Sequence, residues 1–167
     1  MHPEAYAWVA RWATDEPLTV LDVGGRDING TARSLFPAAD YTSLDIAAGN
    51  GVDIVADAST WTPDRAYDVV VCCEVFEHTE AWPAICATAY TALRPGGWFI
   101  TTMAGPGRVP HSAVDGGPSL YPGEYYKNVM PAALQAELEL CGFIDVVVDV
   151  QPRPADVRAV AVRPGVA

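Results

Sequence analysis

Residues 19–30 read Thr19-Val20-Leu21-Asp22-Val23-Gly24-Gly25-Arg26-Asp27-Ile28-Asn29-Gly30, a short apolar run that reaches an acid and then opens into glycine. The bulky and β-branched residues of this run are typical of a strand that is buried on both faces of a parallel sheet. The pair Gly24-Gly25 allows the backbone to turn where a Cβ atom would obstruct it. We therefore expect a buried strand followed by a tight turn that a ligand can approach closely.

A second short run, Tyr41-Thr42-Ser43-Leu44-Asp45, follows after one intervening segment and also ends in an acid. An apolar strand, a glycine turn, a helix and a second strand ending in an acid describe a nucleotide-binding βαβ unit, in which the second acid accepts hydrogen bonds from ribose hydroxyls. The glycines do not form the G-x-G-x-x-G pattern that places a pyrophosphate at a helix N-terminus. This departure favours a nucleoside ligand without a phosphate at the turn.

Apolar periodicities along the rest of the chain predict alternating helices and strands, which is typical of an α/β fold. Helices are expected over residues 3–13, 31–36, 82–93 and 131–141. Strands are expected over residues 18–23, 41–44, 53–57 and 67–73, from residue 98 onward, and over 143–150 and 157–162 as a closing hairpin. The irregular segment 105–123 is long for a compact domain, so it is a lid, a binding loop or a disordered segment.

Length and charge limit the function classes. The 167 residues are enough for a single domain, 1–167, with a full core. The formal net charge is -11, with 21 acids against 10 lysines and arginines, so the chain lacks the basic surface that binds a phosphate backbone. We therefore expect no nucleic-acid partner.

The four cysteines are expected to be small buried thiols of a reducing compartment. No pair of them has the C-x-x-C spacing of a metal or redox site, so no metal site is predicted. No apolar stretch approaches the ~20 residues of a membrane span, and the sequence begins without a basic region or an apolar leader. These features predict a cytoplasmic protein with no membrane partner, and they give no indication of its oligomeric state.

The segments Leu21-Asp22-Val23-Gly24 and Leu93-Arg94-Pro95-Gly96-Gly97, together with Asp45 and Asp57, resemble the class I S-adenosylmethionine (SAM) methyltransferases. The resemblance covers essentially the whole chain. It implies an α/β, Rossmann-like three-layer sandwich with a seven-stranded, mainly parallel sheet, an antiparallel last strand and about five helices. It also implies SAM as the cofactor and S-adenosyl-L-homocysteine as the product. The cofactor would bind at the carboxyl ends of the first and fourth strands, where the strand order reverses.

The cofactor-binding residues are carried over position by position. Gly24 matches the first glycine of the family's Asp-x-Gly-x-Gly-x-Gly pattern, whereas Arg26 and Ile28 stand at the places of the later two. In this departure the chain resembles a subset of bacterial and phage methyltransferases with a Gly-x-Arg-Asp-x-Asn-Gly loop. The resemblance assigns Asp57 to the adenine amino group, and a helix N-cap is the competing interpretation. The predicted set is Asp22, Gly24, Gly25, Arg26, Asp45, Ile46, Asp57, Ala58, Cys73 and Glu74.

Methyl transfer is an in-line displacement at the sulfonium methyl, so the protein supplies position, desolvation and in some cases a base. His111 is the candidate base near neutral pH, although a solvent-facing position or a lid hydrogen bond is an equal interpretation. Glu74 is the candidate for a group that faces both cofactor and acceptor, with Tyr125 or Tyr126 orienting the acceptor. For His78, packing and capping of the next helix is the favoured interpretation.

Three functional hypotheses follow. The first is a SAM-dependent methyltransferase acting on oxygen or nitrogen of a small molecule or glycan precursor. The second is a nicotinamide-dependent oxidoreductase on a related fold, which is weakened by the missing pyrophosphate glycines. The third is a non-catalytic SAM-binding module, which the altered glycine loop allows.

Overall fold

The strands of this chain form one sheet in a computed structural model that describes residues 1–166. The strands are β1 (Thr19–Val23), β2 (Asp40–Asp45), β3 (Ile54–Val55), β4 (Tyr67–Cys73), β5 (Leu93–Ala104), β6 (Ile144–Gln151) and β7 (Asp156–Val162). The α-helices are α1 (Pro3–Val9), α2 (Trp82–Ala92) and α3 (Pro131–Leu140), and the 3-10 helices are η1 (Ala10–Trp12), η2 (Arg33–Leu35) and η3 (Phe76–His78).

The sheet has the strand order β3-β2-β1-β4-β5-β7-β6. Strands β1 to β5 pair in parallel, and β7 runs antiparallel to both β5 and β6. The seven-stranded, mainly parallel sheet with an antiparallel last strand is therefore confirmed, as is the closing hairpin. The order reverses between β1 and β4, which is the place where open α/β sheets bind ligands.

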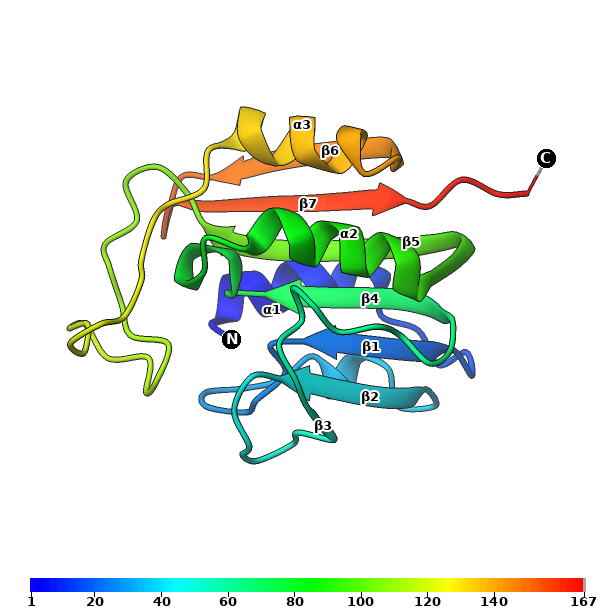
Figure 1. The fold of residues 1–167 in the computed structure, drawn as a ribbon, viewed down its shortest axis with the longest axis horizontal. Helices are drawn as coiled ribbons and strands as arrows, with labels where there is room; N and C mark the ends of the chain where they lie inside the picture. The colour runs from blue at the N-terminus through cyan, green and yellow to red at the C-terminus, as the bar shows by residue number, and fades with distance from the viewer. Residues whose placement is uncertain (167) are drawn as a thin grey trace.

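Helices cover both faces of the sheet. Figure 1 shows α2 and α3 in front of the sheet and α1 behind it. Along β4, Val70 and Cys72 pack in the apolar cluster that includes residues of α2 and α3, whereas Val69 and Val71 pack in the cluster under α1. Both faces of the central strands are thus buried, which explains their continuous apolar sequence.

Three predicted elements are shorter than expected. The helix predicted over residues 31–36 is only the 3-10 turn η2, and the Thr31 hydroxyl accepts a hydrogen bond from the Arg33 N–H at 3.2 Å. Such local side-chain bonds compete with helix formation. Strand β3 pairs over two residues at the sheet edge, and the first helix ends at Val9 and continues as η1. The segment Pro95-Gly96-Gly97 lies inside β5, where the register with β4 shifts and Gly96 has a φ of +81°.

The segment from Gly105 to Met130 contains neither helix nor strand. In Figure 1 it extends beyond the arrowheads of the parallel strands, on the side where the N-terminus also lies. The Arg26 guanidinium donates to the carbonyl of Ala113 at 3.0 Å, which ties this segment to the turn after β1. The long loop thus encloses the carboxyl edge of the sheet. Among residues 1–166, no helix is both long enough and apolar enough to cross a membrane.

Candidate active site

A cavity of about 640 Å³ lies at the carboxyl ends of the parallel strands, and its volume is typical of a small-molecule or cofactor site. Its walls come from the turn after β1, the ends of β2 and β4, the 105–123 loop and the N-terminal residues. Most of the predicted cofactor-binding residues line it, together with the candidate base. These residues are Gly24, Arg26, Asp45, Ile46, Asp57, Ala58, Cys73, Glu74 and His111.

The turn after β1 and the acid at the end of β2 lie side by side, because β1 and β2 are parallel neighbours with Val23 opposite Leu44. Gly24 has a φ of +75°, and a Cβ atom there would approach the Val75 side chain to 2.1 Å. Only glycine therefore fits this turn. The carboxylate of Asp45 accepts hydrogen bonds from the backbone N–H groups of Arg26 at 3.2 Å and Ala47 at 2.9 Å. These bonds fix the carboxylate at the cavity wall.

Asp22 and Gly25 do not line this cavity; they border a neighbouring one of about 30 Å³. Asp22 is buried and accepts a hydrogen bond from the Tyr41 hydroxyl at 2.7 Å. Burial raises the pKa of Asp22 to about 6. A Cβ on Gly25 would lie 2.9 Å from the Asp22 carboxylate and 2.3 Å from the Ser43 hydroxyl. Both residues therefore support the turn from behind.

Asp57 follows β3 and combines a cavity position with a local structural role. Its carboxylate accepts hydrogen bonds from the Ser59 hydroxyl at 2.7 Å and the Ser59 N–H at 2.9 Å. These bonds hold the pKa of Asp57 below its ordinary value. Its carbonyl accepts from the N–H groups of Thr60 and Trp61 in a turn. The competing interpretation, a helix N-cap, is wrong in detail because a turn follows Asp57 instead of a helix.

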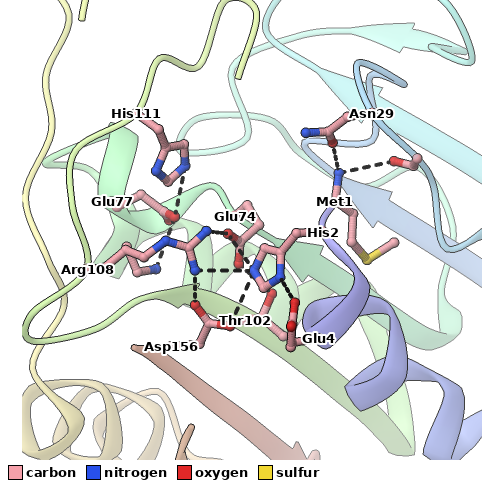
Figure 2. Close-up of polar contacts among 12 residues, drawn as sticks. Met1, His2, Glu4, Asn29, Glu74, Glu77, Thr102, Arg108, His111 and Asp156 are labelled. Carbon is pink, nitrogen blue, oxygen red and sulfur yellow. Dashed lines mark hydrogen bonds and ion pairs between the residues drawn. The ribbon is translucent and has the colours of Figure 1, made fainter. Parts of the chain in front are cut away.

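Glu74 belongs to a charged group that we call the Arg108 cluster: His2, Glu74, Arg108 and Asp156. Figure 2 shows the His2 ring between the two carboxylates, with its Nε2 3.2 Å from Glu74 and 3.3 Å from Asp156. Arg108 pairs with Asp156 and lies 3.8 Å from Glu74. The cluster thus joins two carboxylates to one guanidinium and one imidazole.

The other members of the Arg108 cluster determine the pKa of Glu74. Burial favours the neutral acid, but the hydrogen bond from His2 and the charges of His2 and Arg108 outweigh it and hold the pKa of Glu74 below its ordinary value. Thr102 donates a further hydrogen bond to Glu74 at 3.0 Å. Glu74 has a φ of +58°, which is strained for a residue with a side chain. The predicted role of Glu74 toward an acceptor remains a prediction, since its carboxylate is engaged in these contacts.

A second group, which we call the histidine cluster, consists of Glu77, His78 and His111. The two Nε2 atoms lie 3.3 Å apart, and the Nε2 of His111 lies 3.8 Å from a carboxylate oxygen of Glu77, as Figure 2 shows for the latter pair. The Nδ1 of His111 lies 3.4 Å from the Tyr126 hydroxyl. His111 is therefore held within a polar network at the cavity wall and does not face solvent freely, so both the base and the lid hydrogen bond stay predictions.

Burial dominates the protonation of the histidine cluster. Burial, followed by the proximity of His111, lowers the pKa of His78 to about 4, and burial also lowers the pKa of His111. Burial raises the pKa of Glu77 well above its ordinary value, and the nearby charge of Glu74 adds to the shift. At neutral pH both imidazoles are thus neutral, and each has a nitrogen lone pair.

Sequence reasoning missed four residues at this end of the cavity: His2, Glu77, His78 and Arg108. An acid in the middle of the apolar segment after β4 was a usable signal for Glu77, because a buried carboxyl needs a partner. His2 and Arg108 carry no such signal, since 106 positions separate them along the chain. The four cysteines are free thiols; Cys72 and Cys86 are buried as predicted, whereas Cys73 and Cys141 are partly exposed.

Comparisons with known proteins agree with this architecture. The family described as a methyltransferase domain matches residues 1–143. A relative named ubiquinone biosynthesis O-methyltransferase, from Burkholderia pseudomallei, is 30% identical over 122 residues, which cover 62% of this chain and 52% of the relative. The chain thus spans about half the length of the curated relatives it matches.

Two solved structures show the same fold. Phosphoethanolamine N-methyltransferase 2 of Haemonchus contortus, in complex with SAM, has a TM-score of 0.71 and 17% identity, covering 96% of this chain and 52% of that one. The 1,6-didemethyltoxoflavin-N1-methyltransferase of Burkholderia thailandensis, with bound S-adenosylhomocysteine, has a TM-score of 0.70 and 18% identity, covering 97% of this chain and 77% of that one. The family match favours the methyltransferase hypothesis over the oxidoreductase hypothesis. The chain belongs to the family of methyltransferase domains.

Proposed function

We propose that residues 1–167 form one SAM-dependent methyltransferase domain that transfers a methyl group to oxygen or nitrogen of a small molecule or glycan precursor. The observation that carries this proposal is the juxtaposition of the Gly24 turn and the Asp45 carboxylate on the wall of one cavity. A turn without side chains admits the cofactor, and the carboxylate accepts hydrogen bonds from its ribose hydroxyls. S-adenosylhomocysteine is the product.

Residues at the ends of β2 and β4 would hold the cofactor. Asp45 would hold the ribose, and Asp57 with Ile46 and Ala58 would hold the adenine. Glu74 and Cys73, together with Arg26, would hold the methionine end. The strands from β2 to β5 cover three strand spacings, about 14 Å, which leaves the β5 side of the cavity for the acceptor. The choice of SAM as the cofactor is supported by the SAM and S-adenosylhomocysteine bound in structures of the same fold.

The acceptor lies against the 105–123 loop, where Val109, Pro110 and His111 line the cavity. Bound SAM would supply a sulfonium methyl group, which would bond to the acceptor's oxygen or nitrogen as the carbon–sulfur bond breaks and sulfur keeps the electron pair. The acceptor proton passes to the neutral imidazole of His111 and from there to water. Tyr126, which contacts the His111 ring, orients that imidazole.

Several observations support a small-molecule acceptor. The curated relatives are named for O-methyl transfer, and one structural neighbour is an N-methyltransferase of a small heterocycle. The net charge of -11 opposes binding of a nucleic acid.

The four free thiols favour a reducing, cytoplasmic setting.

Calorimetric titration with SAM and with S-adenosylhomocysteine tests the proposal. We expect saturable binding that Asp45→Ala weakens by about 100-fold or more, because the ribose loses a charged hydrogen-bond acceptor. The matched control Asp64→Ala removes an exposed acid outside the cavity and should leave binding unchanged. The absence of heat at millimolar ligand would refute the proposal. His111→Ala should keep cofactor binding and lower methyl transfer by about 100-fold, as measured by mass gain of candidate acceptors.

A further inference from the structure

The histidine cluster has the composition and spacing of a metal site. One ligand atom each of Glu77, His78 and His111 lies within 4.8 Å of the others. With metal–ligand bonds of about 2.1 Å, the 3.3 Å between the two Nε2 atoms corresponds to an angle of about 104° at a shared ion. The 3.8 Å between His111 and Glu77 corresponds to about 130°. Two imidazoles and one carboxylate are a common ligand set for first-row transition metals.

Glu77 is a buried acid without a cationic partner. Its side chain is 0% exposed, and one oxygen accepts the Ala104 N–H at 3.0 Å. The oxygen that accepts this N–H, Oε1, is also the one that lies 3.8 Å from His111, and the second oxygen, Oε2, has no hydrogen-bond partner among the described residues. Within residues 1–166, no lysine or arginine forms an ion pair with this carboxyl. A buried carboxyl is stable as an anion only when it is paired or coordinates a metal, so a cation at this point would complete the group.

The surroundings of the cluster hold the ligands in place. The Tyr126 hydroxyl donates to the Val109 carbonyl at 3.2 Å and can therefore accept the Nδ1–H of His111, which leaves the Nε2 lone pair of His111 facing His78. An outer-shell partner on the second ring nitrogen is typical of metal-binding histidines. The carbonyl of Glu77 accepts the Lys127 N–H at 2.8 Å, which anchors η3 to the long loop.

We propose that Glu77, His78 and His111 bind one divalent first-row transition-metal ion, such as Zn²⁺, at the acceptor end of the cavity. His78 and His111 line the cavity, so the open coordination positions face the space left for the acceptor. Three protein ligands with an open position are the arrangement of catalytic metal sites.

The role of the ion rests on the proposed function. An ion here takes over proton removal from His111, because a hydroxyl next to a divalent cation loses its proton near neutral pH. The reaction balances as hydroxyl acceptor plus SAM cation giving methyl ether, S-adenosylhomocysteine and one proton, which goes to water. The carbon–sulfur bond breaks and an oxygen–carbon bond forms. The site therefore favours an acceptor with an ionisable hydroxyl.

The test uses the whole chain without a histidine tag, stripped with a chelator and titrated with Zn²⁺ by calorimetry and with Co²⁺ by visible absorption. We expect one ion per chain, a visible Co²⁺ spectrum and a rise in Tm with Zn²⁺. His111→Ala and Glu77→Gln should each weaken Zn²⁺ affinity by at least about 10-fold. His78→Ala is the further variant if either of these fails to fold. The matched control His2→Gln removes a histidine of the Arg108 cluster and should leave Zn²⁺ affinity unchanged.

No binding at millimolar Zn²⁺, or an affinity that none of the three ligand variants changes, would overturn the site. A SAM titration run with and without chelator separates this result from the methyltransferase proposal. Binding of SAM without binding of Zn²⁺ refutes the metal site alone. Binding of Zn²⁺ without binding of SAM supports the site and refutes the proposed function.

Discussion

The Arg108 cluster and the histidine cluster both combine carboxyl groups with histidine at the same edge of the sheet, but their charges are balanced differently; Figure 2 shows the first cluster and, from the second, Glu77 and His111. In the Arg108 cluster, two carboxylates face the Arg108 guanidinium and the His2 imidazole. In the histidine cluster, the Glu77 carboxyl lies 3.8 Å from the His111 imidazole and forms no ion pair with a lysine or arginine of residues 1–166, and burial keeps both imidazoles neutral. The first group carries its own cation, and the second does not.

The difference arises from one side chain of the long loop. Arg108 reaches Asp156 and Glu74, while His111, three positions later on the same loop, reaches Glu77. A guanidinium is always charged and has a forked set of donors, so it fills the space between carboxylates with hydrogen bonds. An imidazole brings a lone pair and leaves room for an ion. A group of carboxylates and histidines is thus structural where an arginine pairs with its carboxylates. Where no arginine pairs with them, the group can bind a metal ion.

Removing the cation of the Arg108 cluster should have the largest effect on stability. Arg108→Met leaves Asp156, whose side chain is 0% exposed, and Glu74 with His2 as their remaining charged partner in the cluster. Breaking a buried ion pair on one side costs about 3 kcal/mol. We expect a loss of this size in the free energy of unfolding, measured by urea denaturation, and weaker SAM binding because Glu74 lines the cavity.

A double variant and a control sharpen this prediction. Asp156→Asn in the Arg108→Met background should recover part of the loss, because the uncompensated charge is gone. Arg153→Met should have little effect, since Arg153 is exposed and forms no ion pair within residues 1–166. A loss as large in Arg153→Met as in Arg108→Met would contradict the assigned role of Arg108.

Glu77→Gln should have a smaller effect on stability in metal-free buffer. The glutamine oxygen can still accept the Ala104 N–H, and its amide can donate to the neutral imidazole of His111. We expect the free energy of unfolding to change by less than about 1 kcal/mol. A loss comparable with that of Arg108→Met would show that Glu77 already has a charged partner in the folded chain, which contradicts the contrast between the clusters.

The sheet could be predicted from sequence because its signals are local. The apolar run 67–73 needs burial on both faces, and the hairpin 143–162 shows two strands around a proline-rich turn. The pairing of the Gly24 turn with Asp45 follows from parallel order, since the carboxyl ends of neighbouring strands meet at one edge. The predicted helix over residues 31–36 was wrong because the hydrogen bond from the Arg33 N–H to the Thr31 hydroxyl competes with helix formation, and only the 3-10 turn η2 forms.

The candidate site was only half predictable for a related reason. The half of the cavity proposed for the cofactor is built from strand ends, whose positions follow from the sheet. The half proposed for the acceptor is built by the long loop and the N-terminal residues, whose side chains meet over large sequence separations. Arg108 and His2, 106 positions apart, converge on Asp156 near the end of the chain. No spacing rule relates these positions, so His78 was interpreted as a packing residue although it lines the cavity.

The smallest of the stability effects concerns His2, which shares the balance of its cluster with Arg108. Burial lowers the pKa of His2, but the hydrogen bond and charge of Glu74, with the carboxylates of Glu4 and Asp156, outweigh burial and raise it. A raised pKa means that protonated His2 stabilises the fold fully below the ordinary histidine pKa, and that this contribution is lost as pH rises through the folded value. Arg108, the remaining charged group at His2, keeps its charge throughout.

We therefore expect His2→Gln to reduce the free energy of unfolding more at about pH 6 than at about pH 9. Urea denaturation of native and variant protein at both pH values measures this difference, and Arg153→Met serves again as the control that should show no pH dependence of its own. An equal loss at both values would mean that His2 contributes by packing and not by charge. The Arg108 cluster would then be balanced by the guanidinium alone, and its contrast with the histidine cluster would rest on that single cation.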